Sequence, residues 1–456
     1  MTLIKSISGI RGTIGGPSGK NLTPLDIVEC VTGYGQWLQT KGGKKIKVVV
    51  GRDGRISGPM VAQLSIQTLL SMGIDVINLD LSTTPTVEMA VLDHNANGGI
   101  IFTASHNPKE WNALKFLNGK SEFISAEDGE QIIEFIQNKK ANYSTVNELG
   151  NLREDHLAIK RHIDHIINLP IIDLQLIKNQ NFTVVVDCIN STGSLAIPEL
   201  LNQLSCKSIL LNEEMSGDFA HKPEPLPENL NELISLMKEN RADLGVAVDP
   251  DVDRLALVCE DGSYFGEEYT LVAAADFVLS KTPGNTVSNL SSTRALSDIT
   301  KKYGHSYFAS AVGEVNVVNT MKANNAVIGG EGNGGVIYPA LHYGRDALVG
   351  IAFILNLMAQ KGKTLSSIRK EYTDYKIIKN KIDLKSEEDL HRIYSSIKNT
   401  FQNEKLNDID GMKIDFAEGW VHVRKSNTEP IIRIYAEAKT EKVAQKLIDQ
   451  VISSFS

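Results

Sequence analysis

Three aspartates, Asp249, Asp251 and Asp253, occupy alternate positions in the segment VAVDPDVDRLAL, directly after an apolar run. In a continuing strand their carboxylates would crowd one face and repel one another, and Pro250 argues against a continuing central strand. A loop that brings three carboxylates together suits a hard divalent cation with oxygen ligands. The segment therefore predicts a Mg²⁺ site.

Three other interpretations compete for this segment. An EF-hand loop would end at Glu260, but its sixth position carries Arg254 instead of glycine, and the flanks are strand-like. A phosphatase of the haloacid dehalogenase type would use the first aspartate as its nucleophile, and this alternative stays open. A solvated acidic turn is disfavoured because the three aspartates directly follow a run that reads as a buried strand.

Ser105 and His106 are neighbours at the end of the apolar run GGIIF, in the segment IFTASHNPKEWNALKF. Neighbouring side chains of an extended segment point to opposite sides, whereas a catalytic base must lie about 2.6–3.2 Å from the serine oxygen. The sequence also lacks the G-x-S-x-G elbow of many serine hydrolases. We therefore expect Ser105 to carry a covalent modification, and a metal loop beside a phosphate pocket suggests phosphate.

Two further loops carry groups that suit a sugar phosphate. In GGEGNGG, five glycines flank Glu331 and Asn333; glycine lets the backbone approach a ligand closely, and the two polar side chains match sugar hydroxyls. In RKSNTEPIIR, guanidinium and hydroxyl groups with backbone N–H groups suit a phosphate dianion. This second set comprises Arg424, Ser426, Asn427, Thr428 and Arg433. Taken alone, each loop is also consistent with an ordinary turn.

A repeated pattern of elements positions these loops. The run KIKVVVGRDGR, the helical pattern GPMVAQLSIQTLLSMG and the run DVINLDL predict a β-α-β unit in a mainly parallel sheet. Similar blocks begin near residues 48, 183 and 286, and each ends in one of the first three loops. Ligands of open α/β sheets bind at such strand ends. The last segment predicts a small α+β domain of strands followed by an amphipathic helix.

Length and composition limit the possible functions. The 456 residues suggest three or four domains of about 100–200 residues. A net charge of −8 argues against nucleic acid as the main partner. Neither a signal peptide nor an apolar segment of the roughly 20 residues that span a membrane is evident, and residues 347–359 are expected to form a buried helix. The four widely spaced cysteines favour reduced thiols and a cytoplasmic location.

Four motifs follow one another along the chain: TASHNP, DPDVDR, GGEGN and RKSNTEP, with GIRG near the N-terminus. In their order and spacing, they closely resemble the motifs of the α-D-phosphohexomutase superfamily. This superfamily includes phosphoglucomutase, phosphomannomutase and phosphoglucosamine mutase, and the resemblance covers essentially the whole chain. It implies three similar α/β domains with mixed sheets and a C-terminal α+β domain around a central cleft. The expected domains are residues 1–152, 153–257, 258–372 and 373–456.

The resemblance also implies roles for individual residues. Ser105 would be the phosphoserine, and its phosphate would join Asp249, Asp251 and Asp253 as ligands of one Mg²⁺ per active site. The sugar would contact Glu331 and Asn333, and its phosphate would bind the RKSNTEP loop. The remaining residues expected at the reacting phosphate are Lys115, Arg254, Arg11 and, with the least support, His106.

The implied reaction interconverts a sugar 1-phosphate and a sugar 6-phosphate through a bisphosphosugar intermediate. We favour glucosamine phosphate as the substrate, with a phosphomannomutase or phosphoglucomutase of broad specificity as the alternative. Bacterial phosphoglucosamine mutases and phosphomannomutases usually have serine where Asn333 stands, so GEGNGG looks more like the archaeal-type branch, whose substrate range is broad or mixed. More remote alternatives are a Mg²⁺-dependent sugar phosphatase that uses Asp249 and a non-catalytic sugar-phosphate sensor. We expect a monomer or homodimer, with no nucleic-acid or membrane partner.

Overall fold

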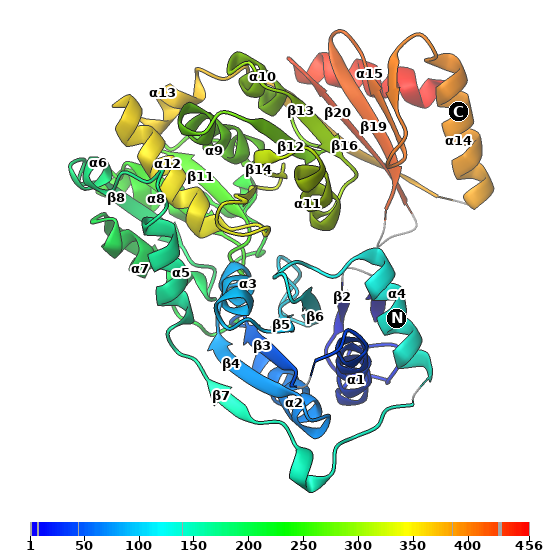
Figure 1. Cartoon of the computed structure of the whole chain (residues 1–456). Coiled ribbons are helices and arrows are strands. Elements are labelled where there is room, and N and C mark those ends of the chain that lie inside the picture. Colours follow the sequence, from blue (N-terminus) through cyan, green and yellow to red (C-terminus); the bar gives the residue numbers. More distant parts are fainter. Residues whose placement is uncertain are drawn as a thin grey trace.

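Figure 1 shows the computed structural model of the chain, which describes residues 2–6, 9–43, 45–138, 140–384, 386–426 and 431–455. Over these residues, strands and helices build four sheets that follow one another along the chain. The N-terminal part lies at the bottom of the view, the middle parts lie above it, and the C-terminal part lies at the upper right.

The first sheet has the strand order β1-β2-β6-β5-β3-β4-β7. Its strands are β1 (Ile4–Ser6), β2 (Gly9–Thr13), β3 (Lys47–Arg52), β4 (Asp75–Leu81), β5 (Gly98–Phe102), β6 (Trp111–Asn118) and β7 (Leu152–Glu154). The helices of this part are α1 (Pro24–Thr40), α2 (Gly58–Ser71), α3 (Thr84–Asp93) and α4 (Ala126–Asn138).

The second and third sheets have four strands each. The second sheet contains β8 (Thr183–Asp187), β9 (Lys207–Leu211), β10 (Leu244–Val248) and β11 (Leu255–Cys259), with helices α5 (Ala158–Ile167), α6 (Leu174–Lys178), α7 (Gly193–Gln203) and α8 (Asn231–Asn240). The third contains β12 (Asn285–Asn289), β13 (Tyr307–Ser310), β14 (Ala326–Glu331) and β15 (Gly335–Ile337). Its helices are α9 (Glu267–Lys281), α10 (Ala295–Lys302), α11 (Glu314–Ala323), α12 (Ala347–Lys361) and α13 (Leu365–Arg369).

The three sheets share one strand topology. In each, the first strand of the block pairs in parallel with the second and the third, and the third pairs antiparallel with the fourth. The connection from the third to the fourth strand is therefore the equivalent loop in each: β5–β6, β10–β11 and β14–β15. These are the loops that carry Ser105, the three aspartates and Asn333, with Glu331 as the last residue of β14.

The fourth sheet is antiparallel, with the order β16-β20-β19-β18-β17. Its elements are β16 (Lys376–Asp383), β17 (Lys405–Asn407), β18 (Met412–Asp415), β19 (Gly419–Lys425) and β20 (Ile431–Ala438), with helices α14 (Glu387–Thr400) and α15 (Glu441–Ser453). The expected fold class, three α/β domains with mixed sheets and a C-terminal α+β domain, is confirmed.

The hydrophobic cores show which parts are tied together. One continuous core extends from Ile163 to Tyr372 and joins the second and third sheets, whereas the fourth sheet has a core of its own. At the centre of the shared core lies α12, whose residues 347–359 are all buried, as expected. Asp346 caps this helix at its start and Gly362 (φ 59°) follows its end. Across the described residues, no helix combines the length and apolarity needed to cross a membrane.

Candidate active site

Ser105 lies against the first of the three aspartates, although they are 144 residues apart in the chain. Its hydroxyl donates a hydrogen bond to Asp249 Oδ2 at 2.6 Å. The backbone of Ser105 has φ 49°, a left-handed conformation that costs free energy for a residue other than glycine. The β5–β6 loop therefore holds the serine in a specific orientation, with its side chain turned toward the β10–β11 loop.

Arg55, which the sequence analysis did not single out, explains how this loop is held. Its fully buried guanidinium forms an ion pair with Asp53 at 3.0 Å and donates to backbone carbonyls of the serine loop. Those carbonyls belong to Ser105, Asn107, Pro108 and Trp111, at 2.5–2.9 Å. The only sequence signal for this role was the β3 loop GRDGR, which resembles an ordinary turn.

The three aspartates converge and are completely buried. One ligand atom from each lies within 4.8 Å of the others, and neither Asp251 Oδ1 nor Asp253 Oδ1 has a hydrogen-bond partner among the described residues. Burial, together with the neighbouring Asp251 and Asp253 charges, raises the pKa of Asp249 well above its usual range. Clustered carboxylate oxygens with unused lone pairs are the donors that Mg²⁺ prefers, so these residues fit the expected ion.

Asp251 is fixed from two sides. Lys115 Nζ lies 2.8 Å from its Oδ2, and Thr84, the first residue of α3, donates to the same oxygen at 2.7 Å. The backbone N–H of Thr84 also donates to the Asp251 carbonyl at 2.8 Å. Burial acts to raise the pKa of Asp251, but the charge and hydrogen bond of Lys115 outweigh it and hold that pKa below its usual range.

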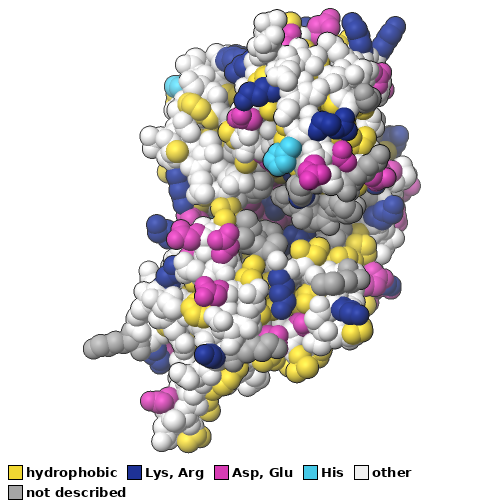
Figure 2. Space-filling view, turned by 90° about the vertical axis from the view of Figure 1, so that its right-hand side faces the viewer, with side chains coloured by type: hydrophobic (Ala, Val, Ile, Leu, Met, Phe, Trp, Pro, Cys, Tyr) yellow, Lys and Arg dark blue, Asp and Glu magenta, His cyan; other side chains and the backbone are white. Residues whose placement is uncertain are grey.

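A cavity of about 110 Å³ opens beside these groups. The predicted residues Arg11, Ser105, His106, Lys115 and Arg254 all line it. Arg254 Nε lies 3.9 Å from both Asp249 and Asp253, so the cavity combines buried carboxylates with several cationic groups. In the space-filling view, the surface is hollowed where the upper and lower parts of the molecule meet (Figure 2). Such a cavity suits a small anion that shares a cation with the aspartates.

His106 lies next to the Ser105 hydroxyl, at a long distance. Its Nδ1 lies 3.4 Å from Ser105 Oγ, at the outer limit for a hydrogen bond. Burial and the nearby Arg254 charge lower the pKa of His106 to about 2. Its imidazole is therefore neutral at ordinary pH.

Arg345 also lines the cavity and connects two of the predicted loops, although the sequence analysis missed it. Its guanidinium lies 2.6 Å from Asp253 Oδ2, 2.8 Å from Glu314 Oε2 and 3.3 Å from Glu331 Oε2. A Cβ at Gly335 would come within 2.3 Å of Arg345 Cδ, so glycine lets the arginine pass the β14–β15 loop. No spacing rule in the sequence points to this arginine, because it precedes a helix that reads as core.

Glu331 and Asn333 occupy the rest of this loop. Glu331 Oε1 accepts from Asn289 Nδ2 at 2.9 Å and from the Gly313 backbone at 3.2 Å. Asn333 Oδ1 accepts from the Gly335 backbone at 3.3 Å, so its oxygen shapes the turn. The carboxylate of Glu331 is thus oriented by neighbours from three segments.

The predicted phosphate pocket begins on two paired strands. Arg424 on β19 lies directly opposite Arg433 on β20, which brings the two guanidinium-bearing residues together. Arg424 is 8% exposed, and its Nε has no hydrogen-bond partner among the described residues. Ser426 is buried and donates its backbone N–H to Ile431. Asn427 and Thr428, the other predicted members, lie outside the described residues.

Comparison with known proteins places the chain in a family. It matches four successive domains of the phosphoglucomutase/phosphomannomutase type: alpha/beta/alpha domain I (residues 3–143), domain II (160–262), domain III (266–375) and the C-terminal domain (380–454). These four matches run in sequence order and cover most of the chain.

Curated relatives agree with this result, and a solved structure shows the same fold. A phosphoglucomutase/phosphomannomutase of Thermococcus kodakarensis is 36% identical over 97% of this chain and 96% of its own length. A phosphoglucosamine/phosphogalactosamine mutase of Sulfurisphaera tokodaii is 32% identical over 97% of each chain. The structure of a phosphoglucomutase/phosphomannomutase family protein from Burkholderia thailandensis has a TM-score of 0.86 and 24% identity, covering 99% of this chain and 96% of that one. The chain therefore belongs to the phosphoglucomutase/phosphomannomutase family, within the α-D-phosphohexomutases.

Proposed function

We propose that this protein is a phosphoglucosamine mutase, which interconverts glucosamine 6-phosphate and glucosamine 1-phosphate by passing a phosphoryl group through Ser105. The observation that carries the proposal is the Ser105 hydroxyl, 2.6 Å from Asp249 in a buried cluster of three aspartates and beside a cationic cavity. A phosphate on this serine would bring a charge of about −1.5 to −2, which Lys115, Arg254, Arg11 and Arg345 are placed to offset.

The cation expected here is one Mg²⁺, held by Asp249, Asp251, Asp253 and a phosphate oxygen on Ser105. When bound, it neutralises charge on the phosphoryl oxygens and orients them. Lys115 would keep Asp251 ionised as a ligand and stabilise charge on the transferred group.

The proposed reaction uses two phosphate sites. Ser105 exchanges a phosphoryl group with the sugar, and a separate pocket holds the phosphate that the substrate already carries. The substrate phosphate binds Arg424, Ser426, Asn427, Thr428 and Arg433, while a free sugar hydroxyl attacks the phosphorus on Ser105. The new O–P bond forms as the Oγ–P bond breaks, and the proton lost by the sugar hydroxyl is balanced by the proton that Ser105 Oγ regains. The bisphosphosugar turns over in the cleft, and its other phosphate returns to Ser105. Glu331 would hold sugar hydroxyls in both orientations.

The choice of sugar rests on relatives. The Sulfurisphaera tokodaii relative is named for glucosamine and galactosamine phosphates, and a Methanopyrus kandleri relative, 30% identical over 98% of this chain and 96% of its own, is named a probable phosphoglucosamine mutase. The Thermococcus kodakarensis relative supports the alternative, a mutase of broad specificity for glucose and mannose phosphates.

Kinetics on the 1- and 6-phosphates of glucosamine, glucose and mannose test the proposal. We expect the highest kcat/KM for glucosamine phosphates, and loss of all mutase activity in Ser105→Ala. A preference for mannose or glucose phosphates would support the broad-specificity alternative. Release of inorganic phosphate that survives in Ser105→Ala would instead identify a phosphatase that uses Asp249.

A further inference from the structure

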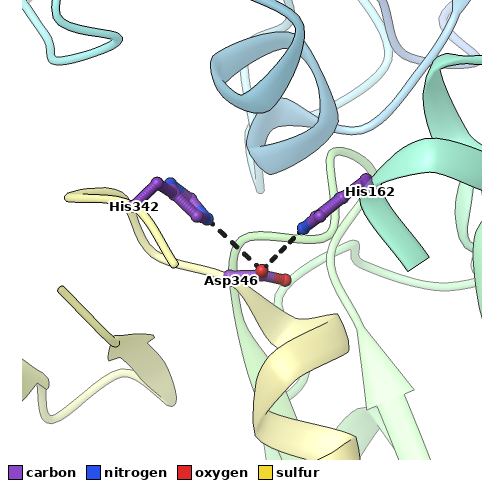
Figure 3. A group of neighbouring side chains, drawn as sticks. All are labelled: His162, His342 and Asp346. Atoms are coloured by element: carbon purple, nitrogen blue, oxygen red, sulfur yellow. Dashed lines mark hydrogen bonds and ion pairs between the residues drawn. The ribbon is translucent and has the colours of Figure 1, made fainter. Parts of the chain in front are cut away.

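A second group of buried side chains that could bind a metal lies where helices of the first, second and third sheets meet. It consists of His162 on α5, His342 in the segment after β15, and Asp346 at the start of α12 (Figure 3). All three are at most 3% exposed. Figure 3 shows both imidazole rings directed at the carboxylate of Asp346 from opposite sides. None of these residues takes part in the reaction proposed above.

The distances between the three groups suit a metal ion. His162 Nε2 lies 3.0 Å from Asp346 Oδ2, and His342 Nε2 lies 3.3 Å from the same oxygen. Two zinc ligands with bonds of about 2.0–2.1 Å at a tetrahedral angle are about 3.3 Å apart. The other oxygen, Asp346 Oδ1, accepts from the backbone N–H groups of Leu348 and Val349 and so fixes the carboxylate.

The outer ring nitrogens have partners of the kind that orient metal-binding histidines. His162 Nδ1 lies 3.0 Å from Thr86 Oγ1, and His342 Nδ1 lies 3.1 Å from Glu88 Oε2, both on α3. Where Thr86 and Glu88 accept from these nitrogens, the protons are held on Nδ1 and the Nε2 lone pairs are left for a metal. A Cβ at Gly344 would lie 1.7 Å from Glu88 Oε2, so glycine there makes room for this carboxylate.

The charges of the group also suit a divalent cation. Glu88 and Asp346 are fully buried, and Glu88 Oε2 is paired with His342 Nδ1 at 3.1 Å. Two buried carboxylates need two positive charges to balance them. One divalent cation bound by neutral histidines would supply both, in place of the proton that the ion pairs of His342 with Glu88 and Asp346 otherwise imply. Two imidazoles and one carboxylate favour zinc over magnesium, which prefers oxygen ligands alone.

We propose that His162, His342 and Asp346 bind one Zn²⁺ ion, with a water molecule as the fourth ligand, at a site that is separate from the catalytic aspartates. The ion would join α5 to α12, with α3 attached through Thr86 and Glu88. The same elements hold the catalytic loop, because Thr84 of α3 contacts Asp251 and Arg345, the neighbour of Asp346, contacts Asp253. Zinc would therefore brace the groups that position the catalytic aspartates.

Metal analysis of the full-length protein tests this proposal. The protein is loaded with Zn²⁺ or Co²⁺, dialysed against excess Mg²⁺, and measured by elemental analysis; the Co²⁺ form is also measured by visible absorption. We expect about one Zn²⁺ per chain and the intense visible bands of four- or five-coordinate Co²⁺. Both should be lost in His342→Ala and in His162→Ala.

Two control variants separate the possible outcomes. Asp251→Asn alters the catalytic aspartates, and His422→Ala removes a buried histidine of the fourth sheet; both should keep the zinc. Zinc that is lost in Asp251→Asn but kept in His342→Ala would overturn the proposal. If the histidine variants do not fold, the wild-type protein alone decides the question. A wild-type protein that retains no zinc, or that shows the weak bands of octahedral Co²⁺, would mean that the cluster is only a hydrogen-bonded ion-pair network.

Discussion

At the scale of single residues, Arg345 makes contacts within the site that the sequence motifs do not reveal. The aspartate and glutamate loops were each recognisable from the sequence, but only the family resemblance linked them, and it named no residue that connects them. In the structure, one guanidinium contacts Asp253 and Glu331 and is itself held by Glu314. Contacts of this kind depend on tertiary packing, so neighbouring residues along the chain could not predict them.

Replacing Arg345 with lysine tests whether this link positions the site. Lysine keeps the charge but cannot contact three carboxylates with a planar fork. We expect kcat to fall by about 10- to 100-fold while KM changes less, because the substrate phosphate binds elsewhere. Arg161→Lys, at an ion pair with Asp93 and Asp155 outside the cavity, should keep wild-type kinetics. Unchanged kcat in Arg345→Lys would contradict the assigned role.

Lys115 offers a second test at the scale of one residue. Removing its charge in Lys115→Met leaves Asp251 without its cationic partner and removes a cation beside Ser105. We expect kcat to fall by about 10²- to 10³-fold, the range typical for loss of one preorganised electrostatic group. Single-turnover transfer from phosphorylated enzyme measures the effect directly, and a rate within threefold of wild type would rule out this role.

At the scale of elements, the repeated β-α-β blocks were predictable because apolar runs and helical periodicity are local signals. All three blocks have the same strand order, and their equivalent loops carry residues predicted for the site. Long-range pairing was not predictable. Three features depend on contacts between distant segments. They are the pairing of β7 with β4, the register that sets Arg424 opposite Arg433, and the core shared by the second and third sheets.

A buried lysine on β18 makes a prediction about stability. Lys413 donates to the Leu290 carbonyl at 2.9 Å, and its Nζ lies 4.5 Å from the centre of the Trp420 ring. Burial lowers the pKa of Lys413 to about 8, so between pH 8 and roughly 10.4 the unfolded chain binds more protons than the folded one. This group alone should therefore make the free energy of unfolding rise with pH over that window, by up to about 3 kcal/mol.

The matched variant Lys413→Met removes this contribution. The difference in unfolding free energy between wild type and variant, followed by denaturant titration from pH 7 to pH 10, isolates Lys413 from other titrating groups. We expect the variant to be relatively more stable at pH 7 than at pH 10. A difference that does not change with pH would show that Lys413 keeps an ordinary pKa.

At the scale of the whole molecule, the fourth sheet is attached to the third sheet differently from the second sheet. The second and third sheets share one core, whereas the fourth has its own and meets the third partly through polar contacts. These include Ser291 Oγ to His422 Nδ1 at 2.9 Å and the Val312 backbone N–H to Asp410 at 2.9 Å. Figure 1 shows this C-terminal part beside the third sheet, above the N-terminal part.

Such an attachment should let the C-terminal part move when substrate binds. Closure would bring the phosphate-binding arginines toward Ser105, and reopening would let the bisphosphosugar turn over. We expect the radius of gyration measured by small-angle X-ray scattering to decrease when a hexose 1,6-bisphosphate is added. Arg424→Ala, which removes a phosphate-binding arginine, should weaken this response. A wild-type profile unchanged at saturating ligand would contradict closure.

The proposed mechanism requires that Ser105 carries the phosphoryl group and passes it to the sugar. Enzyme exposed briefly to a hexose 1,6-bisphosphate is quenched, digested and analysed by mass spectrometry, and a second sample is first mixed with excess glucosamine 6-phosphate. We expect phosphate on the peptide that contains Ser105, and its loss to the sugar in the second sample as bisphosphosugar forms. Phosphate found on Asp249 instead, or an unphosphorylated enzyme with full mutase activity, would contradict this mechanism.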